Sequence, residues 1–202
     1  MIAIIDYGMG NLYSVEKALI KLGADASITS DPQIIAAADH VVLPGVGAFG
    51  DCMRNLEQSG LVPVIHKVIS EGIPFLGICL GLQLLFDGSE EDPGVAGLGI
   101  FPGMVRKIIA PGLKIPHMGW NSLRIERQSP LFEQLQANPY VYFVHSYHAV
   151  PNDPELVTAV TDYGGPVTAA VGRGNVQAVQ FHPEKSSSVG MQILKGFKGM
   201  KA

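Results

Sequence analysis

Apolar runs of four or five residues alternate with amphipathic stretches along the first 86 residues of the chain. The apolar runs predict β-strands at residues 2–5, 26–29, 40–43 and 74–78. Between them, apolar side chains that recur every three or four positions predict helices at residues 11–22, from residue 31 onward, at 61–70 and at 80–86. Strands that alternate with helices in this way form a parallel sheet covered on both faces. This half of the chain therefore predicts an α/β fold with a doubly wound, mostly parallel sheet flanked by helices.

The second half of the chain has a different pattern. Pro-Gly turn signals at Pro93, Pro102 and Pro111 separate short runs such as residues 104–109, which is typical of hairpins. We expect these runs to form an antiparallel extension of the sheet. Further strands are predicted at residues 140–144, 168–171 and 176–181, and a closing helix at residues 189–197. Because no shift of composition divides the chain, a single domain is expected over residues 1–202.

Composition and charge narrow the classes of partner. Hydrophobic residues make up 47% of the chain and charged residues only 16%, which supports a large buried core. The net charge is -4 and the charges are scattered, so we expect binding neither to nucleic acid nor to a membrane surface. The chain starts with an apolar strand rather than a charged leader, and no apolar stretch approaches the roughly 18 residues of a membrane span. A cytoplasmic protein is therefore expected, with small molecules or proteins as partners.

Cys52 and Cys79 are the only cysteines, too few for a disulfide framework. Cys79 directly follows the predicted strand at 74–78, and Gly77 and Gly81 flank it. Small residues at a tight strand-to-helix turn let backbone and substrate approach a nucleophile, and the positive end of the following helix favours a thiolate. The pattern alone favours a nucleophile and a small buried side chain equally. Cys52 lacks such a setting and is interpreted as structural.

A cysteine nucleophile needs a base, and the base needs an acceptor that orients it. Any one of the six histidines is more often a surface or core residue, but His182 has the strongest setting. It follows the predicted strand at 176–181, Pro183 ends that strand, and Glu184 comes two residues later. Because alternate residues of an extended chain project to the same side, the Glu184 carboxylate can hold the imidazole of His182. We therefore predict a catalytic triad of Cys79, His182 and Glu184.

Gly45, Val46 and Gly47 follow the predicted strand at 40–43 and are candidates for the oxyanion hole that acyl transfer requires. Glycine-rich turns are usually only turns. In a doubly wound sheet, however, ligands bind beyond the carboxyl ends of the strands, where both this loop and Cys79 are expected. We therefore interpret the loop and Cys79 as parts of one site.

Segments spread along the chain resemble class I (triad-type) glutamine amidotransferases. These segments are Pro44-Gly45-Val46-Gly47, Gly77-Ile78-Cys79-Leu80-Gly81-Leu82-Gln83 and Phe181-His182-Pro183-Glu184. Within that class, further segments resemble the glutaminase subunits of imidazole glycerol phosphate synthases. They are Asp6-Tyr7-Gly8-Met9-Gly10-Asn11-Leu12, Pro116-His117-Met118-Gly119-Trp120-Asn121 and Tyr142-Phe143-Val144-His145-Ser146-Tyr147. The similarity spans nearly the whole chain.

The resemblance implies hydrolysis of glutamine to glutamate and ammonia through a thioester on Cys79, without a cofactor or a metal. His182 would act as general base and then as general acid, and Glu184 would orient it. The loop from Gly45 to Gly47 would provide the oxyanion hole. The residues implied to bind glutamine are Gln83, Glu91, His145, Ser146 and Tyr147.

The resemblance also implies a protein partner. This is a cyclase subunit of (β/α)8-barrel fold, which receives the ammonia and makes imidazole glycerol phosphate and an aminoimidazole carboxamide ribotide in histidine biosynthesis. We place Asn11, Met118 and Trp120 at this interface, although a tryptophan at position 120 is equally compatible with the core. We also expect the glutaminase to be almost inactive until the partner binds its ligand, which would switch the peptide at Val46 into donor geometry.

Three other functions remain open. Another triad glutaminase, serving pyridoxal phosphate, anthranilate or aminodeoxychorismate synthesis, would share the triad and differ in segments such as 6–12 and 117–121. A cysteine hydrolase or stress-response protein with a flavodoxin-like sheet would also place a cysteine at such a turn, but His182 and Glu184 argue against it. A degenerate domain that only binds and regulates a partner would not need all three triad residues.

Overall fold

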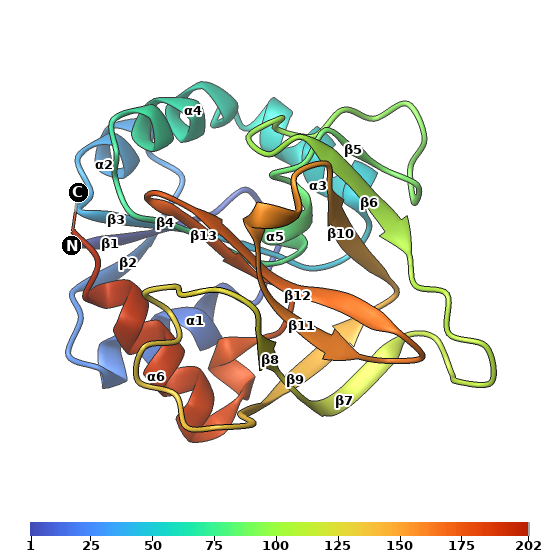
Figure 1. Cartoon of the computed structure of the whole chain (residues 1–202). Helices are drawn as coiled ribbons and strands as arrows, with labels where there is room; N and C mark the ends of the chain where they lie inside the picture. The colour runs from blue at the N-terminus through green and yellow to red at the C-terminus, as the bar shows by residue number, and fades with distance from the viewer. Residues whose placement is uncertain (202) are drawn as a thin grey trace.

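The computed structural model describes residues 1–201, and its centre is an eight-stranded mixed sheet (Figure 1). The parallel strands, in spatial order, are β2 (Ala26–Thr29), β1 (Ile2–Ile5), β3 (His40–Gly45), β4 (Phe75–Cys79) and β13 (Val176–Val179). The sheet continues through the antiparallel strands β12 (Pro166–Arg173), β11 (Val157–Asp162) and β8 (Arg124–Ile125). The prediction of a mostly parallel sheet with an antiparallel extension is thus confirmed, but the run at 104–109, which was expected in this extension, lies in a separate sheet.

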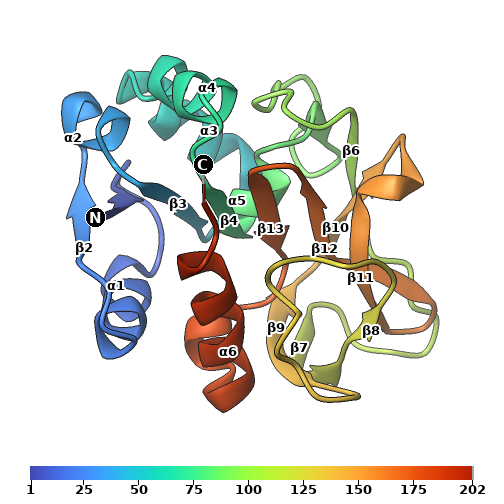
Figure 2. The ribbon, with the colours of Figure 1, turned by 60° about the vertical axis from the view of Figure 1, so that its left-hand side comes forward.

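Helices cover both faces of this sheet (Figure 2). One face carries α2 (Pro32–Ala36), α3 (Phe49–Gln58) and α4 (Val62–Ser70), and the other carries α1 (Leu12–Lys21) and α6 (Ser187–Lys198). Successive strand residues point to opposite faces. In β1, Ala3 and Ile5 therefore lie in the core beneath α2 to α4, while Ile2 and Ile4 lie in the core beneath α1 and α6. All four side chains are buried, which explains why the strand is apolar throughout.

Two smaller sheets complete the second half of the chain. One consists of β10 (Tyr147–Pro151), β6 (Gly103–Lys107) and β5 (Gly88–Ser89), and the other pairs β7 (His117–Ser122) with β9 (Tyr140–His145). Two short 3₁₀ turns, η1 (Pro154–Leu156) and η2 (Pro183–Lys185), follow β10 and β13. Ser146 alone separates β9 from β10, so a single residue joins the two smaller sheets.

Helix α3 is absent from the sequence-based prediction. Its cap residue, Ala48, has no side chain that can accept a hydrogen bond. The backbone N–H of Phe49 instead donates to the carboxylate of Glu91 at 2.9 Å, and that of Gly50 donates to Asp92 at 2.7 Å. Both acceptors lie 42 residues further along the chain. The acceptors that cap this helix are therefore distant in sequence, and no local cap residue marks its start.

The helix predicted at 80–86 is wrong in its second half, because α5 spans only Leu80–Gln83. The carbonyl oxygen of Leu84 accepts a hydrogen bond from the N–H of Leu98 at 2.8 Å, so a distant loop takes the place of the next helical turn. Among residues 1–201, no helix combines the length and the apolar character that crossing a membrane requires.

Candidate active site

Cys79 is the last residue of β4 and lies at a sharp turn into α5. Its backbone has φ 56° and ψ -110°, a left-handed conformation that residues other than glycine rarely adopt. The side chain lines a pocket and is 6% exposed. On the neighbouring strand β3, Gly45 pairs in register with Cys79, so the two strand ends meet at the same edge of the sheet.

The glycines around Cys79 allow backbone segments to approach one another closely. A Cβ atom at Gly81 would lie 1.9 Å from the carbonyl oxygen of Leu43, and one at Gly77 would lie 2.8 Å from the carbonyl oxygen of Gly81. Both contacts are with backbone atoms, which cannot move aside as the end of a flexible side chain can. The Gly-x-Cys-x-Gly pattern is therefore a packing requirement of the turn that presents Cys79.

β13 is the parallel neighbour of β4, and it ends at Val179, two residues earlier than the strand predicted at 176–181. His182 therefore lies three residues beyond the end of β13. Its Nδ1 atom lies 2.9 Å from Oε1 of Glu184. The predicted contact is thus present, but its basis is different: Glu184 lies in the 3₁₀ turn η2 and not in extended backbone. The turn is held because the hydroxyl of Ser186 donates to the carbonyl oxygen of His182 at 2.6 Å and accepts from the N–H of Tyr142 at 2.9 Å.

The electrostatics of this pair favour a protonated imidazole. Burial lowers the pKa of His182, but the neighbouring Cys79 and Glu184 outweigh burial and raise that pKa to about 9. The side chains of His182 and Glu184 are only 3% and 1% exposed. Within the described part of the chain, Nε2 of His182 has no hydrogen-bond partner, so this atom can serve a reacting group. The arrangement can therefore donate and accept a proton next to a thiol.

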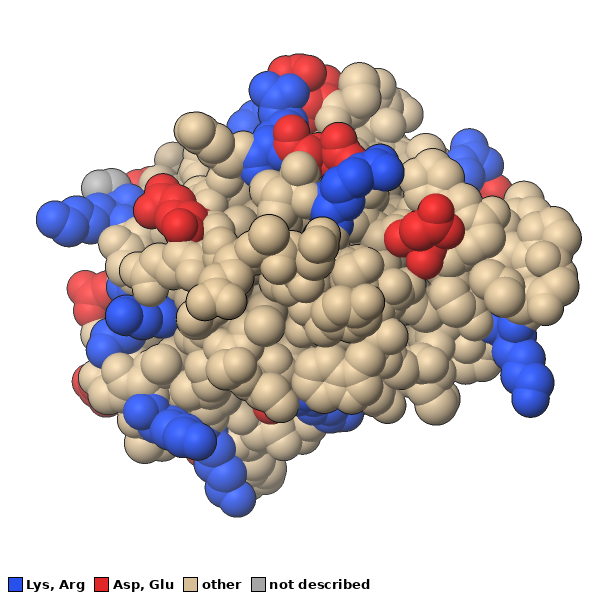
Figure 3. All heavy atoms as spheres, turned by 60° about the horizontal axis from the view of Figure 1, so that its bottom comes forward, with Lys and Arg blue, Asp and Glu red and all other residues tan. Residues whose placement is uncertain are grey.

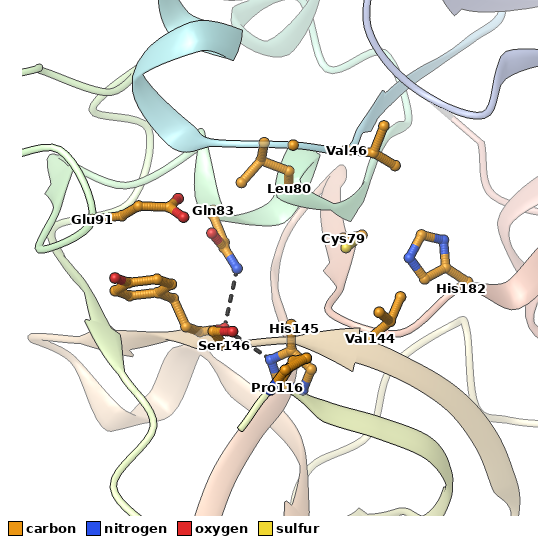
Figure 4. A pocket seen from close by; sticks show the side chains of 12 residues that line it. Val46, Cys79, Leu80, Gln83, Glu91, Pro116, Val144, His145, Ser146 and His182 are labelled. Carbon is orange, nitrogen blue, oxygen red and sulfur yellow. Dashed lines mark hydrogen bonds between the residues drawn. The ribbon is translucent and has the colours of Figure 1, made fainter. Parts of the chain in front are cut away.

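The pocket next to Cys79 has a volume of about 300 Å³ (Figure 4). Its lining residues are Val46, Gly47, Cys79, Leu80, Gln83, Glu91, Pro116, Val144, His145, Ser146, Tyr147 and His182. The structure thus brings together nearly all of the residues that the sequence predicted for the site. Cys79 and His182 lie at one end of the pocket, and Gln83 and Glu91 lie at the other (Figure 4).

The loop predicted to form an oxyanion hole divides into two parts. Gly45 lies within β3, where a Cβ atom would come within 2.9 Å of atoms of Gly81, Leu80 and Tyr7, and it does not line the pocket. Val46 and Gly47 do line it, and Gly47 has a φ of 103°. The thiol of Cys52 donates to the carbonyl oxygen of Val46 at 3.4 Å. Cys52 is therefore a buried contact of this loop and lies outside the pocket lining.

The other end of the pocket consists of polar groups that already have partners. The Nε2 atom of Gln83 donates to the carbonyl oxygen of Tyr147 at 3.1 Å, and Nδ1 of His145 lies 2.8 Å from the same oxygen. Glu91 lines the pocket, but its carboxylate also accepts from the N–H of Phe49 at the start of α3. A substrate that binds here must therefore share or replace these hydrogen bonds.

Gln180 belongs to the site but is missing from the sequence-based prediction. Its Oε1 accepts from Nε2 of Gln83 at 3.0 Å, and its own Nε2 lies 3.7 Å from Sγ of Cys79. The side chain is fully buried. A signal was present in the sequence, because a glutamine interrupts the apolar run before His182 and stands two residues from it, on the same side of an extended chain.

The three residues expected at a protein interface lie at the surface. Met118 and Trp120 are 61% and 52% exposed and lie on the outer face of β7. His117 and Gly119, which alternate with them, face the other way. Asn11 is the cap residue of α1 and is partly exposed. Figure 3 shows the side of the molecule that is lowest in Figure 1, where β7, β9 and α6 lie, and the middle of this side is mostly uncharged. Trp120 is therefore not a core residue in this chain.

In the part of the chain that the structure describes, no group of three or more histidine, cysteine, aspartate or glutamate side chains could hold a metal ion. The chemistry available in the pocket is that of a thiol, an imidazole and a carboxylate. Such a set can carry out acyl transfer from an amide or ester to water.

The chain resembles known proteins over nearly its whole length. The family described as "Glutamine amidotransferase class-I" matches residues 3–198. The chain is 55% identical to the imidazole glycerol phosphate synthase subunit HisH of Moorella thermoacetica, over 97% of this chain and 93% of the relative. It is 56% identical to the HisH subunit of Thermosynechococcus vestitus, over 97% of this chain and 95% of that relative. The solved structure of PurLQS from Thermotoga maritima has the same fold, with a TM-score of 0.77 at 20% identity over 98% of this chain and 96% of that one.

Proposed function

Because the chain belongs to the class I glutamine amidotransferase family, we propose that it is the glutaminase subunit of an imidazole glycerol phosphate synthase. The observation that carries this proposal is the pairing of His182 with Glu184 at 2.9 Å, next to Cys79 in one pocket. The family match over residues 3–198 supports a single domain. We therefore assign the catalytic triad to Cys79, His182 and Glu184.

The chemistry follows from these positions. The thiolate of Cys79 attacks the side-chain carboxamide carbon of glutamine, and the electron pair of the C=O bond moves to the oxygen. Protonated His182 donates its proton to the nitrogen, the C–N bond breaks, and ammonia leaves a thioester on Cys79. Water then attacks the thioester while His182 accepts a proton from it. Glutamate leaves, and the thiolate is restored beside protonated His182.

Glu184 and the raised pKa of His182 support this sequence of steps. The carboxylate of Glu184 holds the Nδ1 side of the imidazole, which directs Nε2 toward the reacting groups. A pKa of about 9 keeps His182 protonated at neutral pH, as required of the group that donates to the leaving nitrogen.

The oxyanion of the tetrahedral intermediate needs a donor, and we assign this role to the backbone of the loop from Gly45 to Gly47. The N–H of Gly47 belongs to the same planar peptide as the carbonyl of Val46. The hydrogen bond from Cys52 to that carbonyl therefore also fixes the direction of the N–H. We propose that binding of the partner and its ligand turns this peptide into donor geometry.

Glutamine would lie between the triad and the far wall of the pocket. Gln83, Glu91 and the segment from His145 to Tyr147 line this wall and offer amide, carboxylate and backbone groups. A charged amino group and a carboxylate both need such partners when they leave water. We therefore assign these residues to the binding of the glutamine head group.

The partner that we propose is a cyclase subunit of (β/α)8-barrel fold, which receives the ammonia in a heterodimer. Support comes from the exposed Met118 and Trp120 on β7 and from the mostly uncharged middle of that side of the molecule (Figure 3). Aromatic residues and methionine are enriched, and charges depleted, at the centres of protein interfaces. Asn11, at the start of α1, is proposed as a polar contact of the same interface.

One experiment tests function and partner together. The full chain is mixed with a candidate cyclase and its ribotide ligand, and glutamate release is compared with that of the chain alone. We expect strong stimulation by the cyclase. Equal rates with and without it would refute the proposed control by the partner. Stimulation by the synthase of another pathway instead, such as pyridoxal phosphate or anthranilate synthesis, would assign the chain to that alternative.

A further inference from the structure

Two buried histidines connect β7 to the pocket. His117 on β7 pairs in register with His145 on β9, and their side chains are 2% and 6% exposed. Nδ1 of His117 lies 3.0 Å from Nε2 of His145. Only His145 lines the pocket, so His117 can act there only through its neighbour.

The direction of this hydrogen bond follows from its neighbours. Nδ1 of His145 lies 2.8 Å from the carbonyl oxygen of Tyr147, which can only accept, so this Nδ1 carries a hydrogen. Burial lowers the pKa of His145 to about 3 and that of His117 to about 4, so both rings are neutral. Nε2 of His145 must then be an acceptor, and His117 donates to it from Nδ1.

The hydrogen bond between Asn121 and His117 also has a defined direction. Nε2 of His117 accepts from the side-chain amide of Asn121 at 3.2 Å. That amide also donates to the carbonyl oxygen of Asp162 at 2.8 Å, and its oxygen accepts from the N–H of Ser122 at 2.8 Å. Because both sides of the Asn121 amide are engaged, only one orientation of the amide satisfies the chain.

The far end reaches the nucleophile. The carbonyl oxygen of Tyr147 accepts from both His145 and Gln83 (Figure 4). Gln83 donates in turn to Oε1 of Gln180, whose Nε2 lies 3.7 Å from Sγ of Cys79. A series of hydrogen bonds, in which donors from both sides meet at the Tyr147 carbonyl, therefore links an asparagine on β7 to the sulfur that we assign as nucleophile.

We propose that His117 is a positioning residue for the glutaminase reaction: by donating to His145, it fixes the Tyr147 carbonyl and, through that oxygen, the amide of Gln83. The inference rests on the proposed function, because the wall so fixed is the one assigned to glutamine. Without the donor, Nε2 of His145 is left buried and unpaired, and the ring can turn away from Tyr147. The expected consequence is weaker glutamine binding, with little change at Cys79 itself.

A purely structural role for His117 must be distinguished from this one. Its ring stacks against Phe143 and Tyr163, with centroid distances of 4.6 and 4.1 Å, so it also fills space. Two variants separate packing from donation. His117→Phe keeps an aromatic ring but has no N–H, whereas His117→Asn loses the ring but retains a donor near the position of Nδ1.

We expect His117→Phe to raise the KM for glutamine roughly 5- to 50-fold, with kcat within about 3-fold of wild type, in the complex with the cyclase. His117→Asn should restore KM toward the wild-type value. The matched control is His40→Phe, because His40 is partly buried, packs edge-on against Phe197 and bonds to the Met200 carbonyl, and it does not line the pocket. An unchanged KM in His117→Phe, or a larger KM in His117→Asn than in His117→Phe, would overturn the proposal.

A second measurement does not depend on activity or on variants. In the full wild-type chain with 15N-labelled histidine, NMR should show both His117 and His145 as neutral Nδ1–H tautomers between about pH 6 and 8. An Nε2–H tautomer of either ring would overturn the positioning role even if the complex is active. If the wild-type complex releases no glutamate, the proposed function fails and the role in glutamine binding fails with it, whatever the tautomers are.

Discussion

His182 and His145 are buried imidazoles that line the same pocket, yet their pKa values are displaced in opposite directions. That of His182 is raised to about 9, and that of His145 is lowered to about 3. At the end with His182, the neighbours are the Cys79 thiol and the Glu184 carboxylate. At the end with His145, the neighbours are a backbone carbonyl and another neutral imidazole.

The difference shows how burial and neighbouring groups together set the pKa, and hence the role, of each imidazole. Burial disfavours the charged imidazole at both ends, and only a partner that can be negative reverses the effect. Cys79 and Glu184 provide such partners, so the end with His182 can move protons. The end with His145 carries directed hydrogen bonds between neutral groups, which hold geometry and resist titration near neutral pH.

Cys79→Ala should produce the largest effect, because it removes the thiol from the end of the pocket that contains His182 and Glu184. Glutamine-dependent synthesis by the complex should fall roughly 10^5-fold or more, because the covalent step is lost. Synthesis from added ammonium salts should persist, since only ammonia generation depends on the thiol. Both rates are measured as formation of the cyclase product, and loss of the ammonium-dependent rate would contradict the division of labour between subunits.

His182→Ala and Glu184→Ala rank the other members of the charged end. Loss of His182 should cost nearly as much glutamate release as loss of Cys79, because the two act as one unit. Loss of Glu184 should be milder by roughly 10- to 100-fold, since it orients the imidazole and does not exchange protons with substrate. The kcat for glutamate release by the complex gives the ranking. Equal losses for all three variants would mean that Glu184 takes a direct part in the chemistry.

Stability should show the same contrast through its dependence on pH. The folded pKa of His182, about 9, lies above its ordinary value of 6.5, so its interactions stabilise the fold fully below about pH 6.5. This stabilisation is lost as the pH rises through about 9. The wild-type advantage over Glu184→Gln in free energy of unfolding should therefore shrink by about 2 kcal/mol between pH 6 and 9.5. Urea titrations at both pH values measure this difference in free energy of unfolding. A difference that does not change with pH would contradict an ion pair between His182 and Glu184.

His117 and His145 should contribute in the opposite window. Their folded pKa values lie below the ordinary value of 6.5. Above about pH 6.5 both rings are neutral in the folded and the unfolded chain, so their burial then costs no stability through protonation. Stability is lost as the pH falls from there toward 4 and 3, because unfolding then allows both rings to bind protons. The two ends of one pocket thus limit stability from opposite sides of the pH scale.

The triad was predicted from local signals in the sequence, whereas the roles of His117 and Gln180 were missed, for a physical reason. Cys79 lies between two glycines that the turn requires, and His182 and Glu184 are two residues apart, so each signal is local. The neutral end depends on contacts between segments: His117 meets His145 across 28 residues, and Gln180 meets Cys79 across 101. Those pairings follow from the register of β7 with β9 and of β13 with β4, which residue patterns in one chain do not specify.

Trp120→Ala should have the smallest effect on the chemistry. It tests whether the outer face of β7, the strand that carries His117, binds the cyclase. Trp120 lies on the outer face of β7, and His117 lies on the inner face of the same strand. If this face binds the cyclase, truncation should raise the Kd of the complex roughly 10-fold or more, while a saturated complex keeps its kcat within about 3-fold. Ile34→Ala is the matched control, because Ile34 is also exposed and lies on α2, on the opposite side of the molecule in Figure 1. Binding is measured by calorimetry and coupling by glutamate release with the ribotide ligand. An unchanged Kd together with normal coupling would show that Trp120 is not at the interface. The hydrogen bonds from His117 to His145 would then position the pocket residues without any contribution from the partner.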